Sequence, residues 1–230
     1  MGNSELNIHS DVIVHLHGIS FTYQGNSRRR PVLEGLDLQI RRGDRAGLVG
    51  PNGSGKTTLF HLIMGLLQPS EGEIEIFGEK RRGERDFKEV RERIGLLFQD
   101  SDDQLFCPTV KEDVAFGPLN LGKTREETTA TVREVLVRLG LEGFEDRLTY
   151  RLSSGEKRLV ALASVLAMKP EVLILDEPTT GLDEDTVKRL VDVLEDSDLT
   201  YLIASHNADF LARTTHVLYR MVQGKLVKTT

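Results

Sequence analysis

The chain contains little of what several classes of protein depend on. It has one cysteine, Cys107. A single cysteine excludes an internal disulfide framework and a cysteine-rich metal site, and it favours a reducing, cytosolic setting. Basic residues number 30 against 36 acidic residues, so the formal net charge is -6. Because general binding to nucleic acid depends on a basic surface, we expect no nucleic-acid partner.

The sequence also lacks a hydrophobic run long enough to cross a membrane. The apolar run Leu159–Met168, which carries no charge, is about half of the ~20 residues that a spanning helix needs. If the protein acts at a membrane, we therefore expect it to act through a partner. Hydrophobic residues make up 39% of the 230 residues, which is enough for a sizeable core in one domain, with or without an inserted lobe.

Two styles of strand are present in the first half of the chain. Residues 12–23 and 36–40 alternate between apolar and polar side chains, which predicts antiparallel strands. Ala46–Val49 is instead a short apolar strand that leads into a glycine-rich turn, and apolar residues then follow at helical spacing over 59–66. The charge-rich segment Lys80–Arg93 is expected to form a solvent-exposed face, with contact to a partner as the alternative.

Short buried strands alternate with helices in the rest of the chain. Gly95–Phe98, Val172–Leu175 and Leu202–Ala204 are apolar runs of strand length, and 183–194 has a helical pattern. Such alternation indicates a mostly parallel sheet covered on both faces. The predicted fold class is therefore α/β.

A polar, helix-rich segment over residues 100–150 separates these strands. It contains two capping boxes, Thr109 with Glu112 and Thr124 with Glu127. The second box precedes a helix with one apolar face, and a glycine at position 140 suits the end of that helix. We interpret this segment as a helical lobe inserted into a sheet domain.

Residues 50–57, with the sequence GPNGSGKT, match the pattern G-x-x-x-x-G-K-[ST] in full, between a strand and a helix. The glycines let the backbone curl so that N–H groups point at phosphate oxygen atoms, and the helix N-terminus adds its positive dipole end. Lys56 is expected to contact the β- and γ-phosphates of a nucleotide, and the Thr57 hydroxyl to bind Mg²⁺. The predicted ATP-binding residues here are Gly50, Pro51, Asn52, Gly53, Ser54, Gly55, Lys56, Thr57 and Thr58.

Two carboxylates follow the apolar strand Val172–Leu175. Open α/β sheets bind ligands at the carboxyl ends of their strands, where Asp176 and Glu177 are expected to lie. Asp176 is predicted to hold Mg²⁺, and Glu177 to act as the general base on an attacking water molecule. The alternative is a solvated acid pair at the end of a strand.

The order of these motifs resembles the nucleotide-binding subunits of ABC transporters over nearly the whole chain. The segment Leu152–Glu156, LSSGE, resembles the family signature LSGGQ, with Ser154 in place of a glycine and Glu156 in place of a glutamine. The resemblance implies that Ser153, Ser154, Gly155 and Glu156 bind the γ-phosphate of ATP held by the opposite subunit. A helix start of this composition is also an anion site, and Ser153 with Glu156 forms a third capping box.

Other positions match the family one by one. The resemblance implies that Tyr23 stacks on adenine and that Gln99 senses Mg²⁺, the water molecule and the transport subunit. It further implies that Asp183 acts across a dimer and that His206 contacts the γ-phosphate. Taken alone, Tyr23 favours a residue of a strand core, and Asp183 a helix N-cap, a role that it can combine with the one across the dimer.

Residues 99–106, QDSDDQLF, and 110–118, VKEDVAFGP, are similar to the ATPases of cobalt transporters and of energy-coupling-factor transporters. The similarity implies an ATPase, with ATP and Mg²⁺, that energises a membrane importer of cobalt or nickel ions. An importer of biotin or another vitamin is the alternative. A soluble ABC ATPase unconnected with transport is a third interpretation, which the acidic composition and the short lobe disfavour.

The implied assembly contains several subunits. Two copies of the chain, or the chain and a paralogous ATPase, are expected to enclose two ATP molecules head to tail. A transmembrane coupling subunit and a substrate-binding membrane subunit complete the implied transporter, with the ATPases peripheral at the cytoplasmic face of the cell membrane.

We expect a P-loop NTPase core with a mostly parallel sheet, an antiparallel β-subdomain and an inserted helical lobe. The expected division is one ABC ATPase domain over residues 1–230, with the catalytic core and the β-subdomain in 1–98 and 155–230. The Q-loop and the helical lobe are expected in 99–154.

Overall fold

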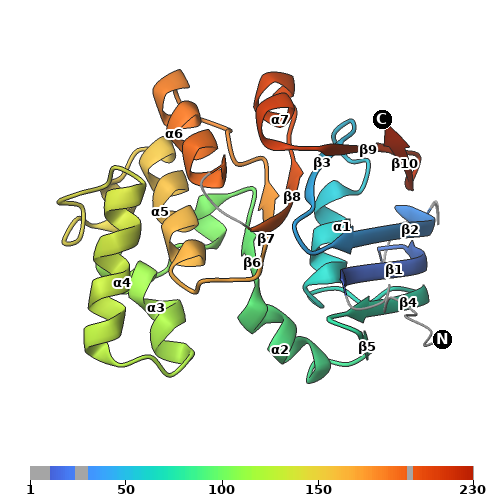
Figure 1. Ribbon diagram of the computed structural model, residues 1–230, viewed down its shortest axis with the longest axis horizontal. Helices are drawn as coiled ribbons and strands as arrows, with labels where there is room; N and C mark the ends of the chain where they lie inside the picture. Colours follow the sequence, from blue (N-terminus) through green and yellow to red (C-terminus); the bar gives the residue numbers. More distant parts are fainter. Residues whose placement is uncertain (1–10, 24–30, 196–198, 230) are drawn as a thin grey trace, which may run out of the picture.

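The computed structural model describes residues 11–23, 31–195 and 199–229. Two sheets and the helices around them form its layers (Figure 1). Across the described residues, no helix combines the length and the apolar character that crossing a bilayer requires.

The first sheet has the strand order β2-β1-β4-β5 and is antiparallel, as the alternating pattern predicts. Leu16 of β1 pairs with Leu38 on one side and with Ile74 on the other, so apolar residues share one face of the sheet. Its strands are β1 (Val12–Phe21), β2 (Leu33–Arg41), β4 (Glu71–Ile76) and β5 (Glu79–Arg81).

The second sheet has the order β10-β9-β3-β8-β7-β6, and all its pairs are parallel except β10 with β9. Every residue of β7 and of β8 is buried, as expected for central parallel strands covered on both faces. Its strands are β3 (Arg45–Val49), β6 (Ile94–Leu97), β7 (Val172–Asp176), β8 (Thr200–Ala204), β9 (Val217–Val222) and β10 (Lys225–Thr229).

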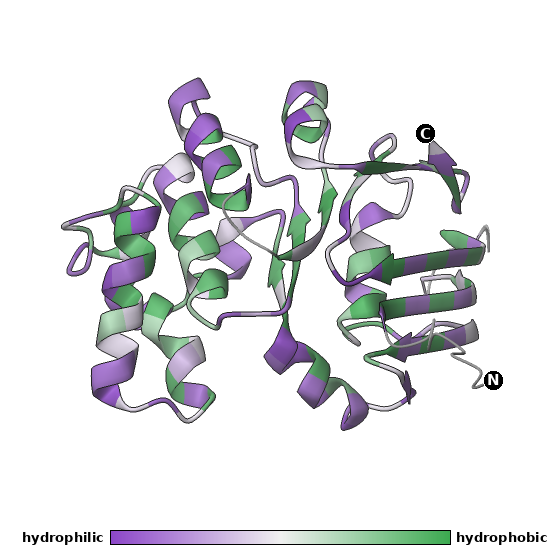
Figure 2. Cartoon of the chain, viewed as in Figure 1, coloured by the Kyte–Doolittle hydropathy of each residue, from purple (hydrophilic) through white to green (hydrophobic). Residues whose placement is uncertain are grey.

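Alternate residues of the central strands contribute to two different cores. Ile174 and Leu202 face the core that contains helix α1 (Lys56–Ile63) and the antiparallel sheet. Leu173 and Ile203 face the opposite core, which contains α5 (Ser154–Leu166), α6 (Glu184–Glu195) and α7 (Ala208–Thr214). Figure 2 shows the central strands β6, β7 and β8 as mainly hydrophobic, whereas the helices around them carry hydrophilic residues on their outer sides.

The segment after β6 forms the remaining helices, η1 (Ser101–Asp103), α3 (Val110–Asn120), α4 (Arg125–Arg138) and η2 (Thr149–Arg151). Both predicted capping boxes are confirmed, and Gly140 lies just after α4 with a φ of 65°. Helices α3 and α4 pack against α5, on its side away from the six-stranded sheet (Figure 1). This segment therefore reaches the sheet mainly through α5.

The prediction that the helix after the glycine-rich turn reaches residue 66 is wrong. Helix α1 ends at Ile63, and Leu66 is 48% exposed. Gly65 has a φ of 67°, and a Cβ at this position would lie 2.1 Å from Cγ of Phe87. Helix α2 (Asp86–Arg93) approaches so closely that only a glycine fits at position 65. The positive φ of this glycine turns the chain after α1.

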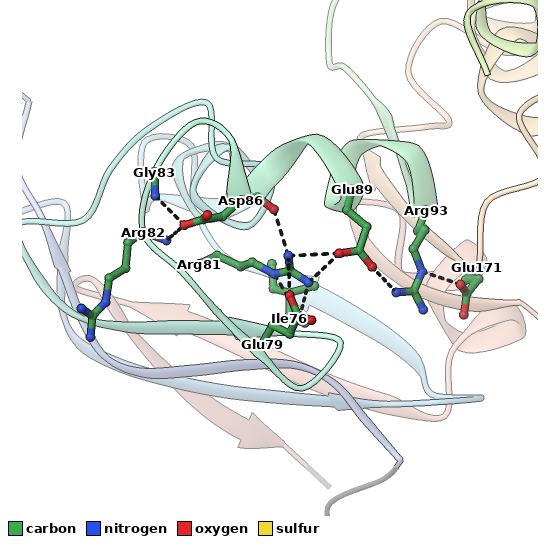
Figure 3. A network of polar contacts seen from close by, with 9 residues as sticks. All are labelled: Ile76, Glu79, Arg81, Arg82, Gly83, Asp86, Glu89, Arg93 and Glu171. Atoms are coloured by element: carbon green, nitrogen blue, oxygen red, sulfur yellow. Dashed lines mark hydrogen bonds and ion pairs between the residues drawn. The ribbon is translucent and has the colours of Figure 1, made fainter. Parts of the chain in front are cut away.

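The prediction of a solvent-exposed face over Lys80–Arg93 is wrong at Arg81, whose side chain is only 3% exposed. Its guanidinium donates to the main-chain oxygen of Ile76 at 3.0 Å and of Asp86 at 3.0 Å, and to the Glu89 carboxylate at 3.2 Å (Figure 3). This charge is buried because α2 packs against β5. The local pattern of charges in the sequence does not predict that packing.

Helix α2 is also tied to the second sheet. Arg93 donates to Glu89 at 2.8 Å and to Glu171 at 2.6 Å, and Glu171 directly precedes β7 (Figure 3). The Arg93 guanidinium lies 3.5 Å from the centre of the Phe77 ring. These contacts join the antiparallel sheet, α2 and the start of β7 through one network.

Replacing Arg81 by methionine tests this network. The change Arg81→Met keeps the apolar stem but leaves buried carbonyl groups without a donor. We expect the free energy of unfolding, measured by urea denaturation, to fall by about 3 kcal/mol. The control is Arg82→Met, since the Arg82 side chain is 79% exposed and its loss is expected to cost less than about 0.5 kcal/mol. Equal effects of the two changes would contradict the structural role of Arg81.

Candidate functional site

A cavity of about 610 Å³ opens at the carboxyl ends of β3, β7 and β8. Parallel pairing of β8 with both β3 and β7 brings these ends together. The residues that line the cavity and were predicted from the sequence are Tyr23, Asn52, Gly53, Gly55, Lys56, Thr57, Thr58, Gln99, Asp176, Glu177 and His206. Most of the predicted site therefore meets in one place.

The glycine-rich loop after β3 wraps around the ammonium group of Lys56. Lys56 Nζ donates to the main-chain oxygen of Gly50 at 2.8 Å and of Pro51 at 3.3 Å. Gly55 precedes α1 with a φ of 108°, and a Cβ there would lie 2.8 Å from a Leu33 methyl carbon. The loop conformation therefore depends on glycine, and a glycine-rich loop that leads into a helix is the type of loop that cradles phosphate.

One further observation on this loop fits an anionic ligand. The hydroxyl oxygen of Ser54 is buried and has no hydrogen-bond partner among the described residues. Buried polar atoms are nearly always paired. A hydroxyl group without a partner, in a glycine-rich loop at a helix N-terminus, is therefore suited to donate a hydrogen bond to a phosphate oxygen.

Thr57 and Asp176 meet at the floor of the cavity. The Thr57 hydroxyl donates to Asp176 Oδ2 at 2.6 Å. Burial raises the pKa of Asp176 above its ordinary value, while the Thr57 hydrogen bond and the charge of Lys56 act in the opposite direction. Two adjacent hard oxygen atoms, one from a hydroxyl and one from a carboxylate, fit Mg²⁺ in ligand type, and the Gln99 side chain lines the same cavity.

Glu177 lies beside Asp176 in an unusual backbone conformation. It is only 8% exposed, and its φ of 50° is in the left-handed region, which costs a non-glycine residue about 1–3 kcal/mol. Its N–H donates to the main-chain oxygen of Ala204 at 2.8 Å, which holds this turn against β8. Its buried carboxylate oxygen Oε1 accepts no hydrogen bond from the described residues. A carboxylate held in this way has capacity left for a polar ligand.

His206 connects Glu177 to the glycine-rich loop. Its main-chain N–H donates to Glu177 Oε2 at 3.2 Å, and its ring Nε2 lies 3.3 Å from Oε1. The same Nε2 lies 2.9 Å from Oδ1 of Asn52. Side chains from the ends of β3, β7 and β8 thus form one polar network around the cavity.

Tyr23, which lies outside the glycine-rich loop, also lines this cavity, and its predicted contact with adenine stays a prediction. Its side chain is 46% exposed, its hydroxyl lies 3.1 Å from the Thr58 hydroxyl, and its ring packs edge-on against Phe21. The strand-core alternative is therefore wrong for Tyr23, because the ring is half exposed and lies beyond the end of β1.

The signature residues lie apart from this cavity. The third capping box is confirmed, since Ser153 N–H donates to Glu156 Oε2 at 2.8 Å and Glu156 N–H donates to the Ser153 hydroxyl at 3.3 Å. Among the described residues, none of 153–156 lines the first cavity, whereas Ser154 lines a second one of about 730 Å³. Gly155 packs closely on the loop between β7 and α6, because a Cβ there would lie 3.2 Å from the Gly181 main-chain oxygen. Their predicted role toward ATP of an opposite subunit stays a prediction.

Asp183 also lies outside the first cavity. Its carboxylate accepts a hydrogen bond from the N–H of Thr186 at 2.8 Å, at the start of α6, and this bond lowers its pKa. The N-cap role is therefore present, and the predicted role across a dimer stays a prediction.

Several residues near the site were missed by the sequence analysis, among them Val32, which lines the first cavity. Thr180 lines both cavities, and His61 lines the second, where burial lowers its pKa. Arg158 is 3% exposed and donates to main-chain oxygen atoms on both sides of the site. The available signal for Arg158 was a basic residue that directly precedes the apolar run 159–163 in α5.

Comparison with known proteins extends these findings. The profile of the ABC transporter family matches residues 33–180. An ABC transporter ATP-binding protein of Nitratidesulfovibrio vulgaris is 54% identical over 88% of this chain and 73% of its own length. The energy-coupling factor transporter ATP-binding protein EcfA of Methanocaldococcus jannaschii is 42% identical over 94% of this chain and 78% of its own.

Solved structures agree with these matches. The cbiO1 protein of Clostridium perfringens, part of the ABC transporter complex cbiONQ, superposes with a TM-score of 0.81 at 36% identity, over 94% of this chain and 87% of that one. A dimeric ATP-binding cassette in a post-hydrolysis state with ADP and Pi superposes with a TM-score of 0.85 at 27% identity, over 95% and 98%. With the P-loop core, the parallel sheet and these matches in agreement, the chain belongs to the ABC transporter family and is one of its ATP-binding, ATP-hydrolysing subunits.

Proposed function

We propose that this ABC ATPase hydrolyses ATP at the cavity between β3, β7 and β8 and thereby energises a membrane importer of cobalt or nickel ions. The observation that carries the ATPase part is the convergence of Lys56, Thr57, Asp176, Glu177 and His206 on one cavity. The similarity of residues 99–106 and 110–118 to cobalt-transporter ATPases carries the part that concerns the cargo.

ATP binds with its phosphates in the loop Gly50–Thr58. Main-chain N–H groups of this loop and the Lys56 ammonium contact the phosphate oxygen atoms, for which the orphaned Ser54 hydroxyl is a further donor. The half-exposed ring of Tyr23 at the cavity mouth stacks on the adenine. Thr58 keeps Tyr23 in place through the contact between their hydroxyl groups.

Thr57, Asp176 and Gln99 hold Mg²⁺. When bound, the ion neutralises negative charge on the β- and γ-phosphates. Asp176 is suited to this because burial has already raised its pKa, so its charge is poorly compensated by the protein alone. The hydrogen bond from Thr57 to Asp176 keeps the two oxygen atoms together.

Glu177 acts as the general base in hydrolysis. Its carboxylate accepts a proton from a water molecule whose oxygen bonds to the γ-phosphorus, and the bond between that phosphorus and the bridging oxygen of ADP breaks. His206 orients the γ-phosphate and the Glu177 carboxylate, because its ring lies between that carboxylate and Asn52 of the loop. The products are ADP and inorganic phosphate.

A dimer completes each site. Ser153, Ser154, Gly155 and Glu156 of one subunit face the γ-phosphate held by the other, with Asp183 at the same interface. The separation of the signature residues from the first cavity within one chain supports this arrangement, as does the likeness to a dimeric cassette. The second subunit is another copy of this chain or a paralogous ATPase.

The chain acts as a single ABC ATPase domain over residues 1–230, with the catalytic core and the β-subdomain in 1–98 and 155–230. Residues 99–154 form the Q-loop and a helical lobe. Two features support this division: η1, α3, α4 and η2 follow one another between β6 and α5, and they reach the sheet mainly through α5.

The membrane part of the transporter consists of a transmembrane coupling subunit and a substrate-binding membrane subunit, with this chain peripheral at the cytoplasmic face of the cell membrane. Gln99 and the acidic segment after it pass the conformational change to the coupling subunit. The likeness to cbiO1, part of a transporter complex, supports these partners. The likeness to proteins named EcfA favours an energy-coupling-factor importer of biotin or another vitamin as the second candidate.

The assignment of the phosphate loop predicts the effect of Lys56→Ala. Loss of the ammonium group is expected to weaken ATP binding by about 100-fold, since a charge-assisted contact to phosphate is lost. Isothermal titration with ATP measures the dissociation constant, and Lys80→Ala, which removes an exposed lysine paired with Glu73, is the matched control. Unchanged ATP affinity in Lys56→Ala would refute the assignment.

The assignment of the general base predicts the effect of Glu177→Gln. We expect kcat for ATP hydrolysis to fall by about 100- to 10,000-fold, and ATP to trap a dimer that size-exclusion chromatography detects. Glu92→Gln is the control, because Glu92 is exposed on α2 and away from the cavity. If Glu177→Gln hydrolyses ATP at the wild-type rate, the base is another residue.

Purification from membranes tests the transport function. Tagged protein is isolated from detergent-solubilised native membranes, and mass spectrometry identifies the proteins and the cargo that accompany it. We expect a coupling membrane protein together with a small substrate-binding membrane protein that carries cobalt or nickel. A bound vitamin in place of the metal would favour the second candidate. Reproducible recovery of ribosomal or DNA-associated proteins alone would overturn the transport assignment.

A further inference from the structure

Helix α5, which opens with the signature residues, carries a buried arginine in its second turn. Arg158 is 3% exposed and is followed by a run of buried apolar residues. Burying a guanidinium group costs free energy unless its N–H groups are well paired, and an apolar side chain of similar length avoids that cost. Arg158 therefore needs a reason beyond packing.

The guanidinium joins two chain segments that are far apart in sequence. Its Nη1 donates to the main-chain oxygen atoms of Phe98 and, at 3.0 Å, of Gln99. Its Nη2 donates to the main-chain oxygen atoms of Asp176 and Glu177. These four carbonyl groups belong to the ends of the adjacent parallel strands β6 and β7 and to the residues just after them. A planar fork with rigidly spaced donors sets the spacing of the two segments.

The same contact restrains the strained residue of the site. Glu177 has a φ of 50°, its N–H is held by Ala204, and its carbonyl group is held by Arg158. Both main-chain groups of Glu177 are thus fixed, and its side chain is thereby aimed into the cavity. Burial lowers the pKa of Arg158, while the charges of Asp176, Glu177 and Asp100 oppose that shift.

Neighbouring contacts attach the segment after Gln99 to the same helix. Lys157 donates to Asp102 at 2.5 Å, and the Gln104 amide donates to the main-chain oxygen of Ala161 at 2.9 Å. Residues 98–104 are therefore held along one side of α5, and Arg158 of the same helix also holds the main-chain oxygen atoms of Asp176 and Glu177.

We propose that Arg158 is a positioning residue for ATP hydrolysis, which holds the backbone at Gln99 and at Glu177 in a fixed relation so that Glu177 is aimed at the attacking water. The inference rests on the proposed roles of Gln99 and Glu177. It makes α5 the element through which a movement of the signature residues or of residues 98–104 reaches the general base.

Three substitutions of Arg158 test the proposal on the full chain, purified with the subunits that accompany it. Arg158→Met removes all donors, Arg158→Gln restores two N–H donors without charge, and Arg158→Lys restores the charge without the fork. We expect Arg158→Met to lower kcat by about 100-fold and to leave the dissociation constant of ATP within about threefold of the wild-type value. Arg158→Gln is expected to recover more of kcat than Arg158→Lys, because the paired N–H groups and not the charge set the geometry.

The matched control is Arg138→Met, since the Arg138 guanidinium also donates to a main-chain oxygen, that of Val193 at 2.9 Å, away from both cavities. It is expected to lower the melting temperature and to leave kcat unchanged. The proposal is overturned if Arg158→Met keeps the wild-type kcat. It is also overturned if the ATP dissociation constant of Arg158→Met rises by the same factor by which kcat falls. Full recovery by lysine but not by glutamine also overturns it. If Arg158→Met does not fold, the order of the glutamine and lysine variants decides.

The outcome for Glu177→Gln separates this inference from the proposed function. If Glu177→Gln is inactive and the Arg158 variants match the wild type, only the positioning role is wrong. If Glu177→Gln is active, the proposed base is wrong whatever the Arg158 variants show.

Discussion

The parallel pairing of β8 with β3 on one side and with β7 on the other decides where the glycine-rich loop, the two carboxylates and His206 lie. Because parallel strands end at the same edge of a sheet, the glycine-rich loop, the two carboxylates and His206 leave it as neighbours. Slippage of one residue in either pair would exchange the buried faces of a strand, and both cores oppose such slippage. The register of the sheet is thus the precondition for the chemistry.

The site keeps features that reduce stability elsewhere in proteins. Asp176 is buried with a raised pKa, Glu177 adopts a left-handed backbone conformation, and Arg158 buries a charge among carbonyl groups. Each is unfavourable alone, and all three meet at the end of β7, a strand in which every residue is buried. Strain and buried charge concentrated on a rigid element are typical of preorganised sites.

Two helices connect this edge of the sheet to the rest of the molecule by different means. Helix α2 is held by ion pairs and hydrogen bonds, through Arg81 to the antiparallel sheet and through Arg93 to the start of β7 (Figure 3). Helix α5 is held by its apolar face and by the contacts of Arg158 to the site. Strand β6 follows α2 directly, and the segment with Gln99 follows β6 and lies along α5. The position of this segment therefore depends on both helices.

Local patterns in the sequence determined much of this protein. The alternation in β1 and β2, the glycine-rich loop, the acid pair after β7 and the capping boxes are properties of a few consecutive residues, because strand pleat, positive φ and helix ends are set by local sterics and hydrogen bonds. The tertiary structure alone decided the burial of Arg81 and Arg158, the end of α1 at Ile63 and the separation of the signature residues from the first cavity. These features depend on contacts between residues distant in the chain, such as Arg158 with Gln99. Such contacts form only when whole helices and strands pack together, so no local sequence pattern predicts them.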